Sequence, residues 1–131
     1  KLSATRKDAD NRKEVNDIGF GSITVIENVF GFRQNFALKE GDNIIGRYNP
    51  GDSITIPIDT NDRSMDRRHC VITVKRDSSG DISYTLRDFP SLTGTFLFNR
   101  ILGDREKVLI EDGAIITLGA TTIILQAPQK Q

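Results

Sequence analysis

One short segment, residues 62–72, concentrates the side chains best suited to polar chemistry. Arg63, Arg67 and Arg68 fall within six residues, directly before the chain's only histidine, His69. A guanidinium is always charged and presents a planar fork of donors, so such a cluster suits the binding of an anion. A second interpretation stays open, in which the loop is solvated and its arginines pair with the aspartates beside them.

Two further short segments place polar groups at the ends of predicted strands, and we call them, together with residues 62–72, the three islands. A Gly-Arg pair at residues 46–47 ends one strand, so that Arg47 projects into a loop and can bind phosphate there. Taken alone, such a pair is more often a solvated surface arginine. Residues 91–99 form a hydroxyl-rich loop that runs into an apolar strand. Its hydroxyl groups can bind a peptide backbone or simply cap a hairpin.

His69 has three possible roles: general base, metal ligand or structural hydrogen bonder. A histidine-rich metal site is excluded because the chain has one histidine. Cys70 follows it, but neighbouring strand residues point to opposite faces, so we expect no Cys–His dyad and place Cys70 in the core. The lone cysteine forms no internal disulfide. We predict no metal and no cofactor, and keep a small enzyme that uses His69 with a carboxylate as a remote alternative.

Length and composition bound the class of protein. The chain has 131 residues, which suits one domain, and 37% of them are hydrophobic, enough for one modest core. The formal net charge is zero, unlike that of a nonspecific nucleic-acid binder. No apolar run is long enough to span a membrane, and no signal peptide is visible. We therefore expect a cytoplasmic protein, with no nucleic-acid or membrane partner. Because the chain begins with Lys1, we expect it to be a fragment of a longer protein.

The distribution of charged, apolar and turn-forming residues along the sequence predicts three regions. Residues 1–18 are rich in charge and read as a polar linker, residues 19–127 as a β domain, and residues 128–131 as a disordered tail. In the middle region, β-branched and aromatic runs alternate with Gly, Pro, Asn and Asp turn signals, which is typical of a sandwich or barrel. The predicted strands are residues 22–27, 35–39, 43–46, 53–58, 69–75, 82–87, 94–98, 114–118 and 121–126.

In this order and spacing, the three islands resemble the forkhead-associated (FHA) domain, a reader of phosphothreonine peptides. The resemblance extends from Ser22 to Gln126, and residues 108–119 are similar to the family's closing strands. It implies an all-β sandwich of about eleven mostly antiparallel strands in two sheets, with the recognition loops at one end. It also implies a protein-interaction module in signalling, whose partner is a protein or phosphopeptide; the oligomeric state is left open.

The resemblance assigns roles residue by residue. It places the phosphopeptide-binding groups at Arg47, Asp66, Arg67, Arg68, Thr93 and Gly94. It gives structural roles to Gly46, His69, Thr95 and Asn99, with His69 bracing the loops. Two of these positions depart from the family pattern: Asp66 stands where the family has its phosphate-binding serine, and Thr93 where it has a peptide-binding asparagine. Ser64, two residues before Asp66, is a possible substitute hydroxyl.

Asp66 leaves the binding activity open. A phosphothreonine carries a charge of about −1.5 to −2, and a unit charge about 4 Å away costs roughly 1 kcal/mol per charge in water. A charged hydrogen bond from Arg47 contributes about 1.5–3 kcal/mol, so the two effects are comparable. One hypothesis is that the domain binds phosphothreonine through its arginines. The alternative is a degenerate domain, in which Asp66 pairs with Arg47 or Arg67 and the module binds proteins independently of phosphate.

Overall fold

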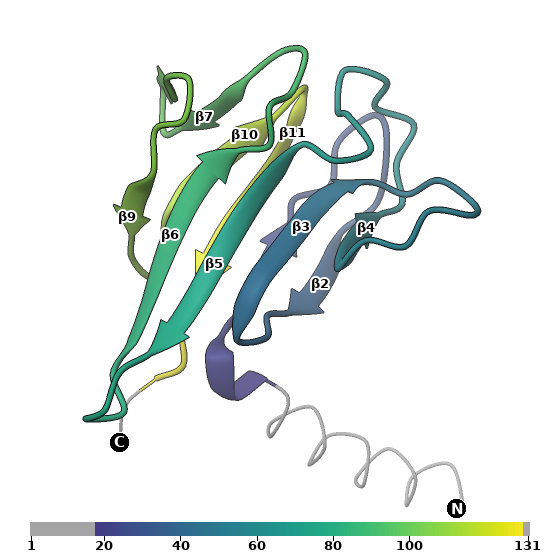
Figure 1. Cartoon of the computed structure of the whole chain (residues 1–131). Coiled ribbons are helices and arrows are strands. Elements are labelled where there is room, and N and C mark those ends of the chain that lie inside the picture. Colours follow the sequence, from purple (N-terminus) through teal and green to yellow (C-terminus); the bar gives the residue numbers. More distant parts are fainter. Residues whose placement is uncertain (1–17, 130–131) are drawn as a thin grey trace, which may run out of the picture.

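The computed structural model describes residues 18–129 as a β-sandwich that follows one turn of 3-10 helix, η1 (Ile18–Phe20) (Figure 1). The strands are β1 (Ser22–Val25), β2 (Gln34–Ala37), β3 (Gly41–Arg47), β4 (Ile56–Ile58), β5 (Cys70–Arg76), β6 (Ile82–Asp88), β7 (Thr95–Leu97), β8 (Arg100–Ile101), β9 (Val108–Ile110), β10 (Ile115–Leu118) and β11 (Thr121–Gln126). One sheet has the order β2-β1-β11-β10-β7-β8 and the other β4-β3-β5-β6-β9. The predicted fold is confirmed.

All described strand pairs are antiparallel except β3 and β4, which run parallel with Gly46 opposite Pro57. The predicted strand 53–58 shortens to β4, because residues 53–55 belong to the loop that returns the chain to the sheet edge. The sequence pattern also missed β8 and β9, since strands of two and three residues carry too little alternation to detect.

Strand β5 shows how the sequence builds the core. Cys70, Ile72 and Val74 are fully buried between the sheets, as the two-residue alternation predicts. Val71 points to the opposite face and is also fully buried. Its cross-strand neighbours on that outer face are Ile44 on β3 and Arg87 on β6. The outer face of this sheet is therefore closely covered near the start of β5.

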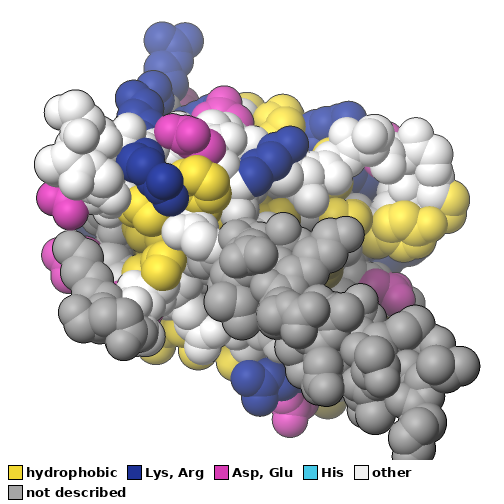
Figure 2. Space-filling model, turned by 90° about the horizontal axis from the view of Figure 1, so that it is seen from below, with side chains coloured by type: hydrophobic (Ala, Val, Ile, Leu, Met, Phe, Trp, Pro, Cys, Tyr) yellow, Lys and Arg dark blue, Asp and Glu magenta, His cyan; other side chains and the backbone are white. Residues whose placement is uncertain are grey.

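The strand registers bring the candidate residues to one end of the sandwich, which we call the loop end (upper part of Figure 1). The β3–β4 loop (residues 48–55), the β4–β5 loop (residues 59–69), the β6–β7 loop (residues 89–94) and the β10–β11 turn (residues 119–120) meet there. Figure 2 views the opposite end, where basic and acidic side chains are interspersed with hydrophobic ones.

The predicted polar linker lies outside the described residues except for Ile18, and the predicted tail except for Pro128 and Gln129. Within residues 18–129, no helix has the length and apolar character needed to cross a membrane.

Candidate functional site

Gly46 lies where the β4–β5 loop presses directly onto β3. A Cβ atom at this position would lie 2.1 Å from the carbonyl oxygen of Arg67 and 2.7 Å from that of Asp66. The loop therefore crosses the strand at a distance that only glycine permits. This close approach fixes the height of the loop above the sheet, and with it the position of Arg47.

Arg47 ends β3 and is attached to the same loop twice. Its backbone N–H donates to the carbonyl of Asp66 (2.9 Å), and its side-chain Nε donates to the carbonyl of Met65 (3.0 Å). The side chain is half-buried. Among the described residues, the two terminal amino groups of the guanidinium have no hydrogen-bond or ion-pair partner. They are thus held in place and available to an anion.

His69 is fully buried and connects two loops. Its Nδ1 accepts a hydrogen bond from the backbone N–H of Asp66 (3.0 Å), so the ring proton is on Nε2, which donates to the carbonyl of Gly94 (2.8 Å). Both nitrogens are engaged, and neither is left to act as a general base. The geometry therefore argues against the catalytic alternative and gives His69 a bracing position between the β4–β5 and β6–β7 loops.

The two positions that depart from the family pattern also connect these loops. The Oδ2 atom of Asp66 accepts a hydrogen bond from the backbone N–H of Leu92 (2.7 Å), and the hydroxyl of Thr93 donates to the carbonyl of Ser64 (3.0 Å). Asp66 forms no ion pair with any arginine in the described part of the chain. The pairing of Asp66 with Arg47 or Arg67 is therefore not observed; a backbone N–H occupies one carboxylate oxygen instead.

Ser64 is oriented toward the interior of the loop. Its hydroxyl donates to Oδ1 of Asp62, which also accepts from the Ser64 backbone N–H (3.0 Å). The Oδ2 atom of Asp62 accepts from the Ala120 N–H (2.9 Å) and the Thr121 hydroxyl (2.7 Å). In this arrangement the hydroxyl proton of Ser64 is not available to a phosphate. Asp62 instead ties the β4–β5 loop to the β10–β11 turn.

Asp88 holds the β6–β7 loop in place through hydrogen bonds, as Asp62 holds the β4–β5 loop. Its carboxylate accepts hydrogen bonds from the backbone N–H of Ser91 (2.7 Å), the Ser91 hydroxyl (2.6 Å) and the Thr95 hydroxyl (2.7 Å). Thr95 is fully buried by this contact. Gly94, which is half-buried, has a φ of 88° that favours glycine. Thr95 and Gly94 therefore shape the β6–β7 loop from within.

The remaining predicted residues lie at the surface of the loop end. Arg67 is exposed, and its backbone is the segment that contacts Gly46. Arg68 reaches the β3–β4 loop, where it forms a long ion pair with Asp52 (3.9 Å). Asn99 is exposed in the turn between β7 and β8 and makes no hydrogen bond with described residues. The structure thus brings the β3 and β4–β5 residues together with Thr93 and Gly94, while Asn99 stands apart.

Asp62 and Asp88 hold the loops but are not among the predicted site residues. The signal was present: an aspartate two or three residues before a serine is typical of side-chain to backbone turns. Within residues 18–129, no group of three or more His, Cys, Asp or Glu side chains could hold a metal ion.

The carboxylates of Asp62 and Asp88 predict that the domain loses stability at acidic pH. Burial raises the pKa of Asp88, but hydrogen bonds from Ser91 and Thr95 outweigh it, so its pKa lies below the ordinary 3.8. The same balance, with hydrogen bonds from Ser64, Thr121 and Ala120, lowers the pKa of Asp62. A lowered pKa stabilises the folded state above the unfolded-state value, and this stabilisation is lost as the pH falls through the folded-state value.

We therefore expect the free energy of unfolding to fall steeply below about pH 4. Chemical unfolding at several values between pH 7 and pH 2 measures this slope. Asp88→Asn should flatten the slope, whereas Asp59→Asn, at an exposed carboxylate without a hydrogen bond to described residues, should leave it unchanged. Equal slopes for all three proteins would contradict the role of Asp88.

Comparison with known proteins identifies relatives of this architecture. A family model for the FHA domain matches residues 34–119. An FHA domain studied for phosphothreonine-dependent interactions is 25% identical, with a TM-score of 0.63 over 83% of this chain and 97% of the other. The FhaA FHA domain, complexed with the intracellular domain of Rv3910, is 26% identical, with a TM-score of 0.61 over 80% of this chain and 98% of the other.

A third solved structure shares the fold. The MEK1 FHA domain, in complex with a phosphothreonine peptide of HOP1, is 18% identical, with a TM-score of 0.68 over 86% of this chain and all of the other. A search of curated protein sequences gives no match.

Proposed function

Because the chain belongs to the FHA domain family, we propose that it is a non-catalytic interaction module that binds phosphothreonine-containing peptides with its loop end. The ligand is a segment of a partner protein. We further propose a cytoplasmic role in signalling, in which a kinase creates the binding site on the partner.

The observation that carries this proposal is the setting of Arg47. Its Nε is fixed to the loop backbone at 3.0 Å while its terminal amino groups have no partner among the described residues. A guanidinium held in this way can form two parallel hydrogen bonds with a phosphate without first being ordered. Arg67 lies exposed on the same loop and adds positive charge close by.

The hydrogen bond of Asp66 supports tolerance of a phosphate. Its Oδ2 already accepts from the Leu92 N–H, so the backbone dipole partly compensates the negative charge of the carboxylate. Repulsion from the remaining charge is comparable with the attraction of one arginine, about 1.5–3 kcal/mol. Two arginines against one aspartate leave a net attraction, and we expect phosphopeptide binding that is weaker than with a neutral residue at position 66.

The test is fluorescence polarisation with a degenerate phosphothreonine peptide pool, beside the same pool without phosphate. We expect saturable binding to the phosphorylated pool alone. Arg47→Ala should reduce it by at least tenfold, since it removes a charged hydrogen bond. Arg63→Ala is the matched control, because Arg63 is exposed on the same loop and its side chain forms no hydrogen bond or ion pair with the described residues. Equal binding of both pools would refute the proposal.

A second candidate function is phosphate-independent protein binding. The hydrogen bonds of Asp66 to Leu92 and of Thr93 to Ser64 favour it, because they occupy groups that would otherwise contact a phosphopeptide. Asp66→Asn decides how much the charge matters, since an asparagine retains an oxygen for the Leu92 N–H. We expect Asp66→Asn and Asp66→Ser to tighten phosphopeptide binding about tenfold. If neither variant binds a phosphopeptide, the second candidate stands.

A further inference from the structure

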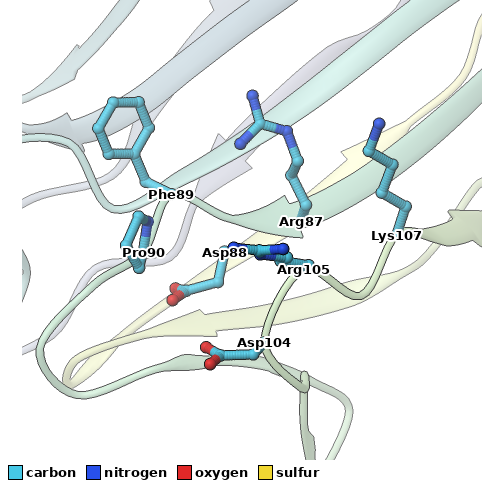
Figure 3. A pocket seen from close by; sticks show the side chains of 7 residues that line it. All are labelled: Arg87, Asp88, Phe89, Pro90, Asp104, Arg105 and Lys107. Carbon is cyan, nitrogen blue, oxygen red and sulfur yellow. The ribbon is translucent and has the colours of Figure 1, made fainter.

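A groove of about 680 Å³ opens beside the candidate site, between the end of β6 and the β8–β9 loop (residues 102–107) (Figure 3). Three cations, Arg87, Arg105 and Lys107, line it together with two carboxylates, Asp88 and Asp104, which leaves an excess of one positive charge. We call it the basic groove. Phe89 and Pro90 line it as well and lead directly into the β6–β7 loop. The groove therefore shares a wall with the loop that holds Leu92 and Gly94.

The sheet register explains why the cations face the groove. Leu86 pairs with Val108 between β6 and β9, so one step further along the register Arg87 stands opposite Lys107. Side chains alternate along a strand, which turns Arg87 to the outer face and Asp88 to the inner one. In Figure 3, Arg87 and Lys107 extend to the same side, and the carboxylates of Asp88 and Asp104 extend to the other.

Three cations lie near one another in this groove and are accessible to an anionic ligand. Among the described residues, none of Arg87, Arg105 and Lys107 forms an ion pair. Asp88 is engaged by Ser91 and Thr95 inside the loop. The chain as a whole has no net charge, so this local excess is not a general property of its surface.

The loop that carries two of these cations has a defined conformation. Glu106 accepts two hydrogen bonds from Arg100 (3.1 and 2.8 Å) and one from the Gly103 N–H (2.7 Å). Arg105 has a φ of 62°, which a side chain other than glycine rarely adopts. A surrounding structure must hold such a residue in place, and segments of this kind concentrate at binding sites. The β8–β9 loop thus has a defined backbone conformation at the positions that carry Arg105 and Lys107.

We propose that the basic groove binds an acidic flank of the ligand, a run of Asp, Glu or phosphorylated residues a few positions from the phosphothreonine. The inference rests on the proposed function and extends it to specificity. An extended peptide covers about 3.3 Å per residue, so a ligand held by the β4–β5 and β6–β7 loops reaches past Pro90 within a few residues. Guanidinium and ammonium groups bind carboxylate and phosphate alike.

A phosphothreonine peptide array with Asp, Glu, Ala or Lys at each flanking position tests the proposal. We expect a preference of about fivefold for acidic residues that weakens with added salt. Arg105→Gln/Lys107→Gln should abolish the preference and leave binding of neutral phosphopeptides unchanged. Lys39→Gln/Lys75→Gln, with the same loss of charge at exposed positions of the opposite end, should retain it. Phosphopeptide binding without an acidic preference, or with a preference that survives the groove variant, overturns the inference alone.

If no phosphopeptide binds, a second measurement decides the groove separately from the proposed function. Hexaglutamate is titrated into the isotopically labelled domain, and the amide signals of Arg87, Arg105 and Lys107 are followed. Shifts at these residues that disappear in the Arg105→Gln/Lys107→Gln variant support an acidic ligand for the groove even though the proposed function has failed. Absence of shifts there overturns the inference as well.

Discussion

Gly46→Ala will destabilise the domain by about 3 kcal/mol and abolish binding at the loop end. The new methyl group would lie 2.1 Å from the Arg67 carbonyl oxygen, so the β4–β5 loop has to move by more than an ångström. Such a movement breaks the hydrogen bond from the Arg47 N–H to Asp66 (2.9 Å) and displaces the guanidinium. Thermal unfolding and peptide titration measure the two effects, and we expect the midpoint to fall by about 10 °C or more.

Gly19→Ala is the control for this prediction. A Cβ atom at Gly19 would meet nothing within 4 Å. Any general cost of replacing glycine with alanine therefore lowers the stability of both variants, whereas the steric clash with the β4–β5 loop affects Gly46→Ala alone. A Gly46→Ala protein with wild-type stability and peptide binding would contradict the requirement for glycine where the loop crosses β3.

Asp62→Asn will cost about 3 kcal/mol of stability, because all four groups around this carboxylate are donors. The backbone N–H groups of Ser64 and Ala120 cannot turn away, and each lies within 3.0 Å of a different oxygen. An asparagine places an NH2 group against one of them, whichever way it is oriented. The residue is 1% exposed, so water cannot replace the lost acceptor.

Urea unfolding of Asp62→Asn and of Asp59→Asn separates this effect from a simple loss of charge. Asp59 is exposed, and we expect its variant to remain within about 0.5 kcal/mol of wild type. Amide signals of the β10–β11 turn should broaden or shift in Asp62→Asn, since that turn loses its connection to the β4–β5 loop. A stability loss no larger than that of Asp59→Asn would contradict the assigned role.

The fold was predictable because its signals are local. Alternation placed Cys70, Ile72 and Val74 in the core, and turn residues separated most strands. The shortest strands were not predicted: β8 has two residues and β9 three, too few for a pattern. The bounds of β4 were too wide, because this strand depends on its parallel pairing with β3. Such elements are defined by their neighbours rather than by their own sequence.

The site was predictable in position but not in its connections. The islands correctly brought Arg47, Asp66 and Thr93 to one end of the molecule. The partner of Asp66 is a backbone N–H 26 residues away, and that of Thr93 a carbonyl 29 residues away. Almost every residue offers the same backbone N–H and C=O groups, so a sequence does not show which of them will meet Asp66 or Thr93. A charged residue such as arginine is therefore the more obvious partner to predict.

The contacts between the β4–β5 and β6–β7 loops also bear on the thermodynamics of association. His69, Asp66 and Thr93 each donate or accept a hydrogen bond across the two loops before any ligand arrives. Binding then costs the conformational entropy of the peptide, but little conformational entropy of the protein. Association should therefore proceed nearly as a rigid-body encounter, with a small conformational entropy change in the domain. Exchanging exposed side chains at the loop tips, such as Arg67 or Leu92, would then alter selectivity without altering the frame that presents them.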